Sequence, residues 1–356
     1  MKILFISLGC DKNLVDTEVM LGMLASRGYE MTNDEQEADI IVINTCCFIH
    51  DAKEESIQNI LEMAEYKKNG SAKALIVTGC MAERYRQEIL DEIPEVDEVL
   101  GTTAYDRILD AVDAALAGQH EVMTADLDAL PLPETKRLVT TGGHFAYLKI
   151  AEGCDKHCTY CIIPYARGRV RSRHPEHIIK EIEKISENGI KEVVLTGINL
   201  TAYGTDFAYK NVKDQENKYM NKKLNKEYKV NKPDEIDSPN IKIENVEIVK
   251  KLENLDNVSS EKYELKELKN YRLIDLLEDI NKIPKIKRIR LGSLEPTIIT
   301  EEFVERLSKL EKVCDHFHLS LQSGCTETLK RMNRKYTAEE AEKATERIRK
   351  FFPNAA

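Results

Sequence analysis

Three short apolar runs in the first third of the chain each end with a cysteine, in the letters SLGC, NTC and TGC. Between and after these runs, apolar residues recur at the spacing of one helix face. Short β-type runs that alternate with helices are typical of a parallel, doubly wound sheet. We therefore predict an α/β domain with a parallel sheet over residues 1–118. The predicted strands are residues 2–8, 38–44 and 73–78, and the predicted helices are residues 13–27, 54–67 and 82–93.

The three cysteines that end these runs are Cys10, Cys46 and Cys80. Parallel strands deliver their carboxyl ends to one edge of a sheet, where ligands usually bind. A single buried cysteine is commonly just a small apolar side chain, but three in equivalent positions favour a shared metal centre, which we interpret as an iron–sulfur cluster. Cys47 points to the opposite side of its strand from Cys46, so we leave it out of the set.

A second set of three cysteines is Cys154, Cys158 and Cys161, a C-x3-C-x2-C run in a loop directly after a predicted strand. Structural zinc normally has four protein ligands. Three thiolates on one short loop suit a four-iron cluster with one iron left open, and an open iron can chelate the amino and carboxylate groups of S-adenosylmethionine (SAM). We predict that His157 is solvated, because a fourth ligand would block that iron. These three cysteines are thus the predicted catalytic centre.

A second β/α series follows residues 119–142, whose prolines and glycines are typical of a linker. Four β/α units fit most of a partial (β/α) barrel, whose chemistry lies at the C-terminal strand ends. We assign residues 143–356 to this second domain. Its predicted strands are residues 146–150, 192–195, 288–291 and 316–321, and its predicted helices are residues 175–188, 271–280, 301–310 and 338–351.

Small or polar residues follow three of these barrel strands, at the same edge as the cysteine loop. A glycine there lets the backbone approach a ligand closely. We predict that these residues bind the SAM cofactor: Gly197, Asn199, Ser293, Glu295 and Gln322. The remaining cysteines, Cys314 and Cys325, are predicted to be packing residues.

Residues 206–270 interrupt the barrel series with a stretch rich in Lys, Asn and Glu. Its low apolar content predicts a solvated, mostly disordered insertion. The net charge of the chain, −10, argues against a protein that coats nucleic acid through bulk electrostatics.

The cysteine content and the chain start bear on location. Nine cysteines without a secretory signal point to metal or redox use. The apolar runs are strand-sized, and MKILF enters a strand directly, so we predict neither a membrane-spanning helix nor a signal peptide. A cytoplasmic enzyme without a membrane partner is the default expectation.

The two cysteine patterns in this order, SLGC…NTC…TGC and then GCDKHCTYCIIP, resemble the methylthiotransferase family of radical-SAM enzymes. The resemblance covers the chain except for residues 206–270. It implies a flavodoxin-like N-terminal domain, a radical-SAM partial barrel and a C-terminal RNA-binding TRAM β-barrel. It also implies two 4Fe-4S clusters and SAM as cofactors. The auxiliary cluster's ligands would be Cys10, Cys46 and Cys80, and the SAM cluster's ligands would be Cys154, Cys158 and Cys161.

Different parts of the chain resemble different branches of this family. The letters SLGCDKNLVDTEVM and NTCCFIHDAKEES are similar to the branch that modifies an aspartate of a small-subunit ribosomal protein. From about Tyr165 onward, YARGRVRSR and HFHLSLQSGCTETLKRMNRKYT resemble instead the branch that acts on threonylcarbamoyladenosine beside the tRNA anticodon. We rank the ribosomal protein first, because the N-terminal half matches that branch throughout. The tRNA stays an alternative, because the barrel half lines the substrate cavity.

The sequence ends before the last barrel strands and the TRAM domain that the resemblance implies. The expectation is therefore a barrel truncated at its C-terminus, without the TRAM domain. An alternative of another class follows, namely an inactive, truncated fragment that still binds iron–sulfur clusters. An active enzyme would also need an external electron donor as a partner.

Overall fold

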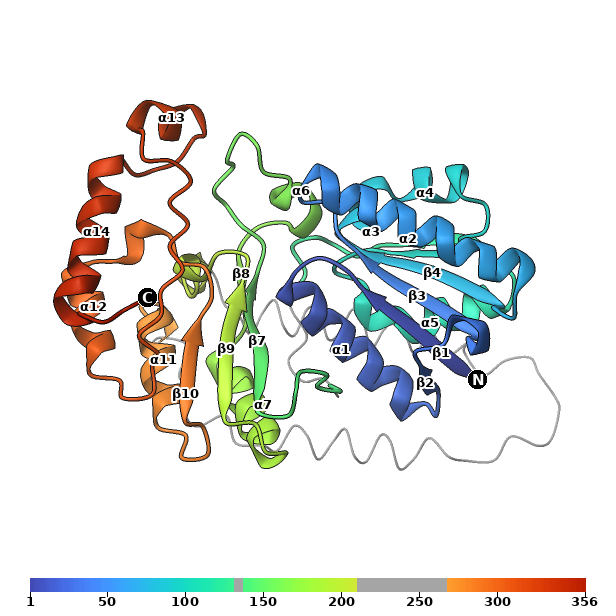
Figure 1. Cartoon of the computed structure of the whole chain (residues 1–356), viewed down its shortest axis with the longest axis horizontal. Coiled ribbons are helices and arrows are strands. Elements are labelled where there is room, and N and C mark those ends of the chain that lie inside the picture. Colours follow the sequence, from blue (N-terminus) through green and yellow to red (C-terminus); the bar gives the residue numbers. More distant parts are fainter. Residues whose placement is uncertain (131–136, 210–267) are drawn as a thin grey trace, which may run out of the picture. The chain divides into compact units, whose positions relative to one another are not determined.

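The N-terminal part of the protein is built on a six-stranded parallel sheet with strand order β2-β1-β3-β4-β5-β6 (Figure 1). The structure, a computed structural model, describes residues 1–130, 137–209 and 268–356. The sheet confirms the predicted parallel α/β domain. Its strands are β1 (Lys2–Ser7), β2 (Glu30–Thr32), β3 (Ile40–Thr45), β4 (Ala74–Gly79), β5 (Glu98–Leu100) and β6 (Glu121–Met123).

The two central strands, β3 and β4, are buried along their whole length. Their sequences, IIVINT and ALIVTG, are continuous apolar runs because helices cover both faces of the sheet. On β3, Ile41 and Ile43 pack in one core cluster while Ile40 and Val42 pack in the other. The period of two along the strand thus divides one apolar run between two cores.

Five helices cover the two faces of this sheet. The core with Ile41 includes Ile60 of α2 and Met81 of α3, whereas the core with Ile40 includes Met20 of α1. The predicted helix over residues 82–93 is in fact two helices, because the backbone of Arg86 adopts a positive φ of 45° between them. The helices are α1 (Asp11–Ser26), α2 (His50–Asn69), α3 (Cys80–Tyr85), α4 (Gln87–Glu92) and α5 (Ile108–Leu116).

The sheet extends beyond the boundary predicted at residue 118. Strand β6 lies inside residues 119–142, the predicted linker, and pairs in parallel with β5 through Val99 and Val122. The three-residue strands β2, β5 and β6 were not predicted, since three residues are too few to show an alternating pattern. The linker is therefore shorter than the proline and glycine content suggested.

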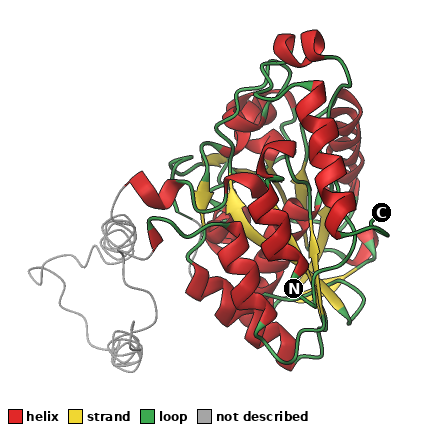
Figure 2. Cartoon of the chain, turned by 90° about the vertical axis from the view of Figure 1, so that its left-hand side faces the viewer, coloured by secondary structure: helices red, strands yellow, loops and turns green. Residues whose placement is uncertain are grey.

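The second part of the protein is a four-stranded sheet with order β10-β9-β7-β8. Strands β7, β9 and β10 run parallel, and the short β8 runs antiparallel to β7. Figure 2 shows the strands lying among the helices. The strands are β7 (Phe145–Glu152), β8 (Arg171–Ser172), β9 (Glu192–Gly197) and β10 (Arg288–Leu291). The helices are α6 (Ile163–Arg167), α7 (Pro175–Glu187), α11 (Leu273–Asn281), α12 (Glu301–Ser308), α13 (Thr326–Arg331) and α14 (Ala338–Phe351).

The predicted strand over residues 316–321 is wrong. This segment makes one isolated bridge, between Leu294 and Leu319. Backbone hydrogen bonds two residues apart, such as Leu321 N to Leu319 O, bend the chain away from a regular ladder. Phe317 N instead donates to Ala356 O at 2.9 Å, so the last residues of the chain occupy part of this edge.

By its internal contacts the chain divides into two units, one of Met1–Asp206 with Arg272–Ala356 and one of Phe207–Tyr271. The predicted insertion over residues 206–270 falls almost entirely in the second unit. Its residues 210–267 lie outside the described part of the chain. Within the described ranges, each helix is too short or too polar to cross a membrane.

Candidate functional site

Three of the four cysteines of the N-terminal domain, which we call the first triad, follow three neighbouring strands. Cys10 precedes α1 directly after β1, Cys46 follows β3, and Cys80 begins α3 after β4. Strands β1, β3 and β4 are adjacent and parallel, so their carboxyl ends lie at one edge, as the sequence predicted. All three thiols are free; Cys46 and Cys80 are buried and Cys10 is exposed.

Two glycines set how closely these cysteine loops approach one another. Gly9 has a φ of +88°, and a Cβ added there would lie 2.8 Å from Cys46 Cβ and 3.1 Å from Cys46 Sγ. Gly79 has a φ of +94°, and its Cβ would lie 2.4 Å from Thr45 O. Both contacts are shorter than van der Waals packing allows. Glycine is therefore required at both positions for the loops to meet.

Asn13, in the first turn of α1, joins two of these loops. Its Nδ2 donates hydrogen bonds to Leu8 O and to Thr45 O, each at 3.0 Å. Its Oδ1 lies 3.9 Å from Cys80 Sγ. The sequence analysis missed Asn13, because its complete burial and its hydrogen bonds to distant loops appear only in the folded chain.

The thiols of this first triad influence one another electrostatically. Burial raises the pKa of Cys80, and neighbouring Cys10 and Cys46 raise it further, while Arg167 lowers it. Burial is also the main cause that raises the pKa of Cys46. Metal ligation requires deprotonated thiols, so a positive group beside them favours the ligating form.

Cys47 has a different environment. It is buried in the core cluster beside α2 and its Sγ lies 3.3 Å from Cys80 O. Burial raises the pKa of Cys47 to about 12, which keeps this thiol protonated. Cys47 is thus a packing residue in this fold.

Cys154, Cys158 and Cys161 lie in the loop between β7 and α6. Gly153 precedes this cysteine loop with a φ of +68°, and a Cβ there would lie 1.8 Å from Arg169 O. Cys154 N donates to Gly168 O at 3.0 Å, which ties the start of the loop to the end of α6. Burial raises the pKa of Cys154 and of Cys161, and the thiol of Cys158 raises both further.

A distant segment around α13 holds the cysteine loop. Arg334 Nη1 donates to Cys158 Sγ at 3.3 Å, and Asn333 Nδ2 donates to His157 O at 2.9 Å. The imidazole of His157 is exposed, as predicted. Tyr160, within the loop, donates from its hydroxyl to Gln322 Oε1 at 3.0 Å. The sequence analysis did not single out Arg334 or Asn333.

The predicted SAM-binding residues differ in how near they lie to the cysteine loop. Asn199 Nδ2 lies 3.9 Å from Cys154 Sγ, and Gln322 accepts from Tyr160. Buried Glu295 pairs with Lys156 of the loop at 2.7 Å and with Arg334 at 3.7 Å.

The other two predicted SAM-binding residues have other surroundings. Gly197 ends β9 beside Ala151 of β7, where an added Cβ would lie 3.3 Å from the Ala151 carbonyl oxygen. Ser293 Oγ hydrogen-bonds to His318 Nδ1 at 2.8 Å. SAM contacts by these five residues stay a prediction.

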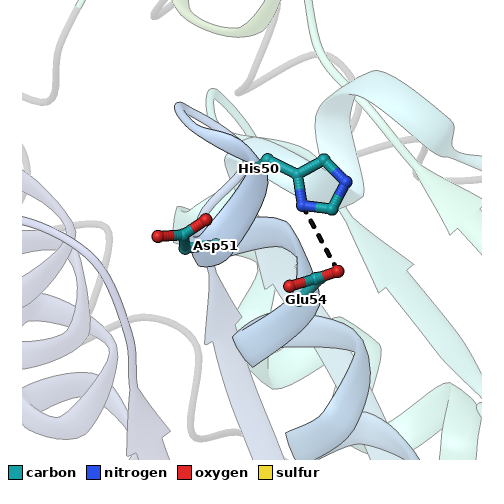
Figure 3. Close-up of side chains that lie close together, drawn as sticks. All are labelled: His50, Asp51 and Glu54. Atoms are coloured by element: carbon teal, nitrogen blue, oxygen red, sulfur yellow. Dashed lines mark ion pairs between the residues drawn. The ribbon is translucent and has the colours of Figure 1, made fainter.

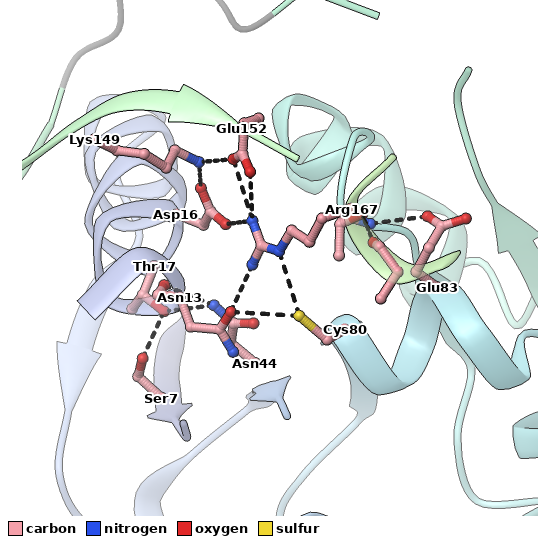
Figure 4. A network of polar contacts seen from close by, with 12 residues as sticks. Ser7, Asn13, Asp16, Thr17, Asn44, Cys80, Glu83, Lys149, Glu152 and Arg167 are labelled. Atoms are coloured by element: carbon pink, nitrogen blue, oxygen red, sulfur yellow. Dashed lines mark hydrogen bonds and ion pairs between the residues drawn. The ribbon is translucent and has the colours of Figure 1, made fainter. Parts of the chain in front are cut away.

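A buried polar network surrounds Arg167, the last residue of α6 (Figure 4). Its side chain is 1% exposed. Arg167 Nε donates to Cys80 Sγ at 3.3 Å, Nη1 donates to Asp16 Oδ2 at 2.8 Å, and Nη2 donates to Asn13 Oδ1 at 2.5 Å. Nη1 also lies 3.2 Å from Glu152, which pairs with Lys149. This network, which joins α1, α3, β7 and α6, was not predicted from the sequence.

His50, Asp51 and Glu54 at the start of α2 also lie close enough together to reach one cation (Figure 3). All three are exposed, and His50 Nδ1 pairs with Glu54 Oε1 at 3.3 Å across one helical turn. Exposed side chains at a helix start are ordinary solvated groups, so we assign no metal to them.

The two remaining cysteines also lie outside both triads. Cys314 is half-buried and Cys325 is exposed, so packing is the wrong interpretation for Cys325. Hydrogen bonds from Thr328 and from the backbone of Glu327 lower the pKa of Cys325.

Both parts of the chain match known protein families. Residues 2–101 match the Uncharacterized protein family UPF0004, and residues 148–355 match the Radical SAM superfamily. The chain is 43% identical over 356 residues to the ribosomal protein uS12 methylthiotransferase RimO of Lachnoclostridium phytofermentans, covering all of this chain and 67% of that protein. It is 37% identical over 356 residues to RimO of Clostridioides difficile, covering all of this chain and 66% of that protein. The chain thus spans about two thirds of the length of these relatives.

Solved structures of radical-SAM enzymes share the fold. TsrM, a radical S-adenosylmethionine methyltransferase from Kitasatospora setae, has a TM-score of 0.54 and 12% identity, covering 98% of this chain and 65% of that one. OxsB, a cobalamin-dependent S-adenosylmethionine radical enzyme, has a TM-score of 0.57 and 13% identity, covering 98% and 48%. At such identities the likeness concerns the fold alone, and it confirms the predicted architecture.

The family matches bear on the cofactors. The Radical SAM match covers the cysteine loop and the strands beside it, and supports an iron–sulfur cluster and SAM as the cofactors here. Family models match both halves of the chain, and the two relatives align over its whole length at 43% and 37% identity. The chain belongs to the radical-SAM methylthiotransferase family.

Proposed function

We propose that this chain transfers a methylthio group to an unactivated carbon, that each cysteine triad holds one 4Fe-4S cluster, and that the substrate is an aspartate of ribosomal protein uS12. The observation that carries the proposal is the pair of cysteine triads in a chain 43% identical, over its full length, to a uS12 methylthiotransferase. The relatives align through both halves of the chain, including the residues after Tyr165.

The residues of both triads fit an iron–sulfur cluster. Each triad offers three free thiols from loops held close by glycines, at positions 9 and 79 in one case and 153 in the other. Three thiolates leave one iron of a four-iron cluster without a protein ligand. When bound, the cluster on the C-x3-C-x2-C loop would supply the electron that cleaves SAM, and the auxiliary cluster would present the sulfur that is methylated and transferred.

The chain's own residues would keep the SAM site in place. Arg334 donates to Cys158 and pairs with Glu295, which also pairs with Lys156 of the loop. These charges connect the cysteine loop to the end of β10 and to the segment after α13. Tyr160 adds a hydrogen bond to Gln322. A loop fixed at several points would hold its three thiols in one orientation toward the cofactor.

The test offers both candidate substrates to one protein. The full chain, reconstituted anaerobically with iron and sulfide, receives SAM, dithionite, and either uS12 or a tRNA that carries threonylcarbamoyladenosine. Mass spectrometry then looks for a gain of one methylthio group. Modified uS12 is the expected result. Modified tRNA alone would replace the proposed substrate, and SAM cleavage without either product would contradict both.

The inactive-fragment alternative has its own outcome in this experiment. A chain that binds iron and shows absorbance near 400 nm but leaves SAM intact under dithionite would be such a fragment. The variant with Cys154, Cys158 and Cys161 replaced by alanine provides the background, since it lacks the loop thiols that the proposal requires.

A further inference from the structure

We infer that Arg167 is a positioning residue that raises the reduction potential of the cluster held by Cys10, Cys46 and Cys80. The inference rests on the proposed function, because it requires a cluster at this first triad. Arg167 belongs to α6, directly after the cysteine loop of the other triad, yet its Nε donates to Cys80 Sγ at 3.3 Å. One side chain thus links the two cysteine sites.

The neighbours of Arg167 orient its guanidinium group. Asp16 and Glu152 accept from Nη1, and Asn13 Oδ1 accepts from Nη2 at 2.5 Å. The guanidinium is planar with its N–H groups in a fixed fork, so holding the two Nη atoms also fixes the direction of Nε–H. That remaining donor points at the Cys80 thiol (Figure 4).

Arg167 already has carboxylate partners for its charge, so it does not need the Cys80 thiol to neutralise it. Two cations, Arg167 and Lys149, face two carboxylates, Asp16 and Glu152. Burial would lower the pKa of Lys149, but Asp16 and Glu152 raise it, so both cations are charged. Tyr105 faces Lys149 at 5.2 Å. These four groups balance one another without Cys80, with Arg171 as a further cation near Glu152, and Arg167 nevertheless donates to the sulfur.

A buried cation beside a ligating sulfur changes the redox equilibrium in one direction. Reduction adds an electron and makes the cluster more negative, so a nearby positive charge stabilises the reduced form more than the oxidised form. Hydrogen bonds to sulfur, net charge and solvent exposure are known determinants of cluster potential. With its side chain 1% exposed, Arg167 is little screened by water. Removing it would therefore make the cluster harder to reduce.

The test uses the full chain with Cys154, Cys158 and Cys161 replaced by alanine, so that a single cluster reports in a redox titration followed by electron paramagnetic resonance. In this background, Arg167→Met is expected to change the ratio of reduced to oxidised cluster at a fixed potential by at least tenfold, equivalent to about 59 mV for one electron. Arg167→Lys keeps the positive charge, so its potential is expected to lie between that of the background protein and that of Arg167→Met.

Arg137→Met is the matched control. Arg137 is also buried, with its side chain 3% exposed, and it pairs with Glu18 and Glu181 rather than with a thiol. We expect the potential of the Arg137→Met protein to equal that of the background. A shift as large as that of Arg167→Met would mean that any buried arginine has this effect, and would overturn the inference.

A second variant covers the outcome in which Arg167→Met does not fold. The double change Arg167→Met with Asp16→Asn removes one charge of each sign and keeps the network balanced. It is expected to shift the potential in the same direction but by less, because losing the Asp16 carboxylate offsets part of the loss of the cation; the offset is partial, since Asp16 contacts Nη1 and not the Nε that faces the sulfur. An unchanged potential in a folded variant without Arg167 overturns the inference, whereas a background protein that binds no iron overturns the proposed auxiliary cluster itself.

Discussion

At the scale of single residues, glycine geometry determines how closely the cysteine loops of the first triad can approach one another. Gly9 and Gly28 both have a positive φ, +88° and +91°. A Cβ at Gly9 would collide with Cys46, whereas at Gly28 nothing lies within 4 Å. Replacing Gly28 therefore tests backbone strain alone, whereas replacing Gly9 tests backbone strain together with crowding against Cys46.

The first prediction compares Gly9→Ala with Gly28→Ala. Gly28→Ala is expected to lose about 1–2 kcal/mol of stability, because alanine is strained at a positive φ. Gly9→Ala is expected to lose this amount and more, because its Cβ would also collide with Cys46. Because Cys46 must then move, Gly9→Ala is also expected to lose the iron of the first triad. Chemical denaturation and iron content measure the two effects. Equal stability loss and equal iron in both variants would show that the close approach of Gly9 to Cys46 is unimportant.

Some residues of the candidate site could be predicted from the sequence and others could not. Cys10, Cys46 and Cys80 could be predicted because each follows a strand within a few residues, and strand ends follow from local apolar patterns. Arg167 and Arg334 were missed because their partners are far away in sequence, Asn13 being 154 residues from Arg167 and Cys158 being 176 residues from Arg334. Only the packing of distant elements brings these pairs together.

At the scale of elements, the pairing of β5 with β6 puts like charges opposite each other. Glu98 of β5 is fully buried and its register partner on β6 is Glu121. Burial raises the pKa of Glu98 to about 7, and the charge of Glu121 raises it as well. Like charges directly opposite in neighbouring strands destabilise a sheet.

The second prediction concerns how stability depends on pH through Glu98. The folded protein holds this proton up to about pH 7, while the unfolded chain releases it near its usual value of 4.5. The folded state therefore binds more protons between these values, and the contribution of Glu98 to stability falls as pH rises from about 4.5 to about 7. Glu98→Gln is expected to gain on the order of 2–3 kcal/mol at pH 8 relative to the parent, and little at pH 4.

Thermal denaturation of the metal-free protein at both pH values measures this effect. Glu121→Gln is the matched control, because it removes the opposing charge but leaves the buried carboxyl in place, and a smaller gain is expected. A Glu98→Gln gain that is the same at pH 4 and pH 8 would exclude ionisation as its cause.

Among the elements, sequence patterns predicted the long ones better than the short or irregular ones. The helix α14 was predicted with its observed bounds, and in the structure Thr337 and Glu340 form a capping box that stabilises its first turn. The strand predicted over residues 316–321 alternates polar and apolar residues, yet its backbone pairs with Leu294 and Ala356 instead of forming a ladder. Which backbone pairs with which is a tertiary property that alternation alone does not specify.

At the scale of the whole molecule, buried ion pairs connect α1, which packs on the N-terminal sheet, to the second sheet and its helices. Asp16 of α1 pairs with Lys149 of β7 and with Arg167 of α6, and Glu18 of α1 pairs with Arg137. Breaking a buried pair leaves an uncompensated charge, which is far more destabilising than the loss of a surface pair. These contacts make the two sheets dependent on each other.

The third prediction follows from this dependence. Asp16→Ala leaves Lys149 and Arg167 facing Glu152 alone and is expected to lower stability by about 3–5 kcal/mol. Asp113→Ala removes an exposed pair with Arg27, with side chains 50% and 46% exposed, and is expected to change stability by less than about 1 kcal/mol. Urea denaturation measures both. Similar, small losses in the two variants would contradict a structural role for the buried pairs.

The fold and both cysteine triads could thus be anticipated from the sequence, since strand ends and ligand spacing are local features. The connections between the triads were not, since Arg167 belongs to one domain and contacts a cysteine of the other.

The most direct test of the central claim, two triads that each hold one cluster, is the iron content of the anaerobically reconstituted chain and its triple variants. The account predicts about eight irons for the parent chain and about four for either triple alanine variant, at Cys10, Cys46 and Cys80 or at Cys154, Cys158 and Cys161. The loop variant is also expected to lose SAM cleavage, and Cys47→Ala, the control, is expected to keep all the iron. Full iron in the loop variant would contradict the account.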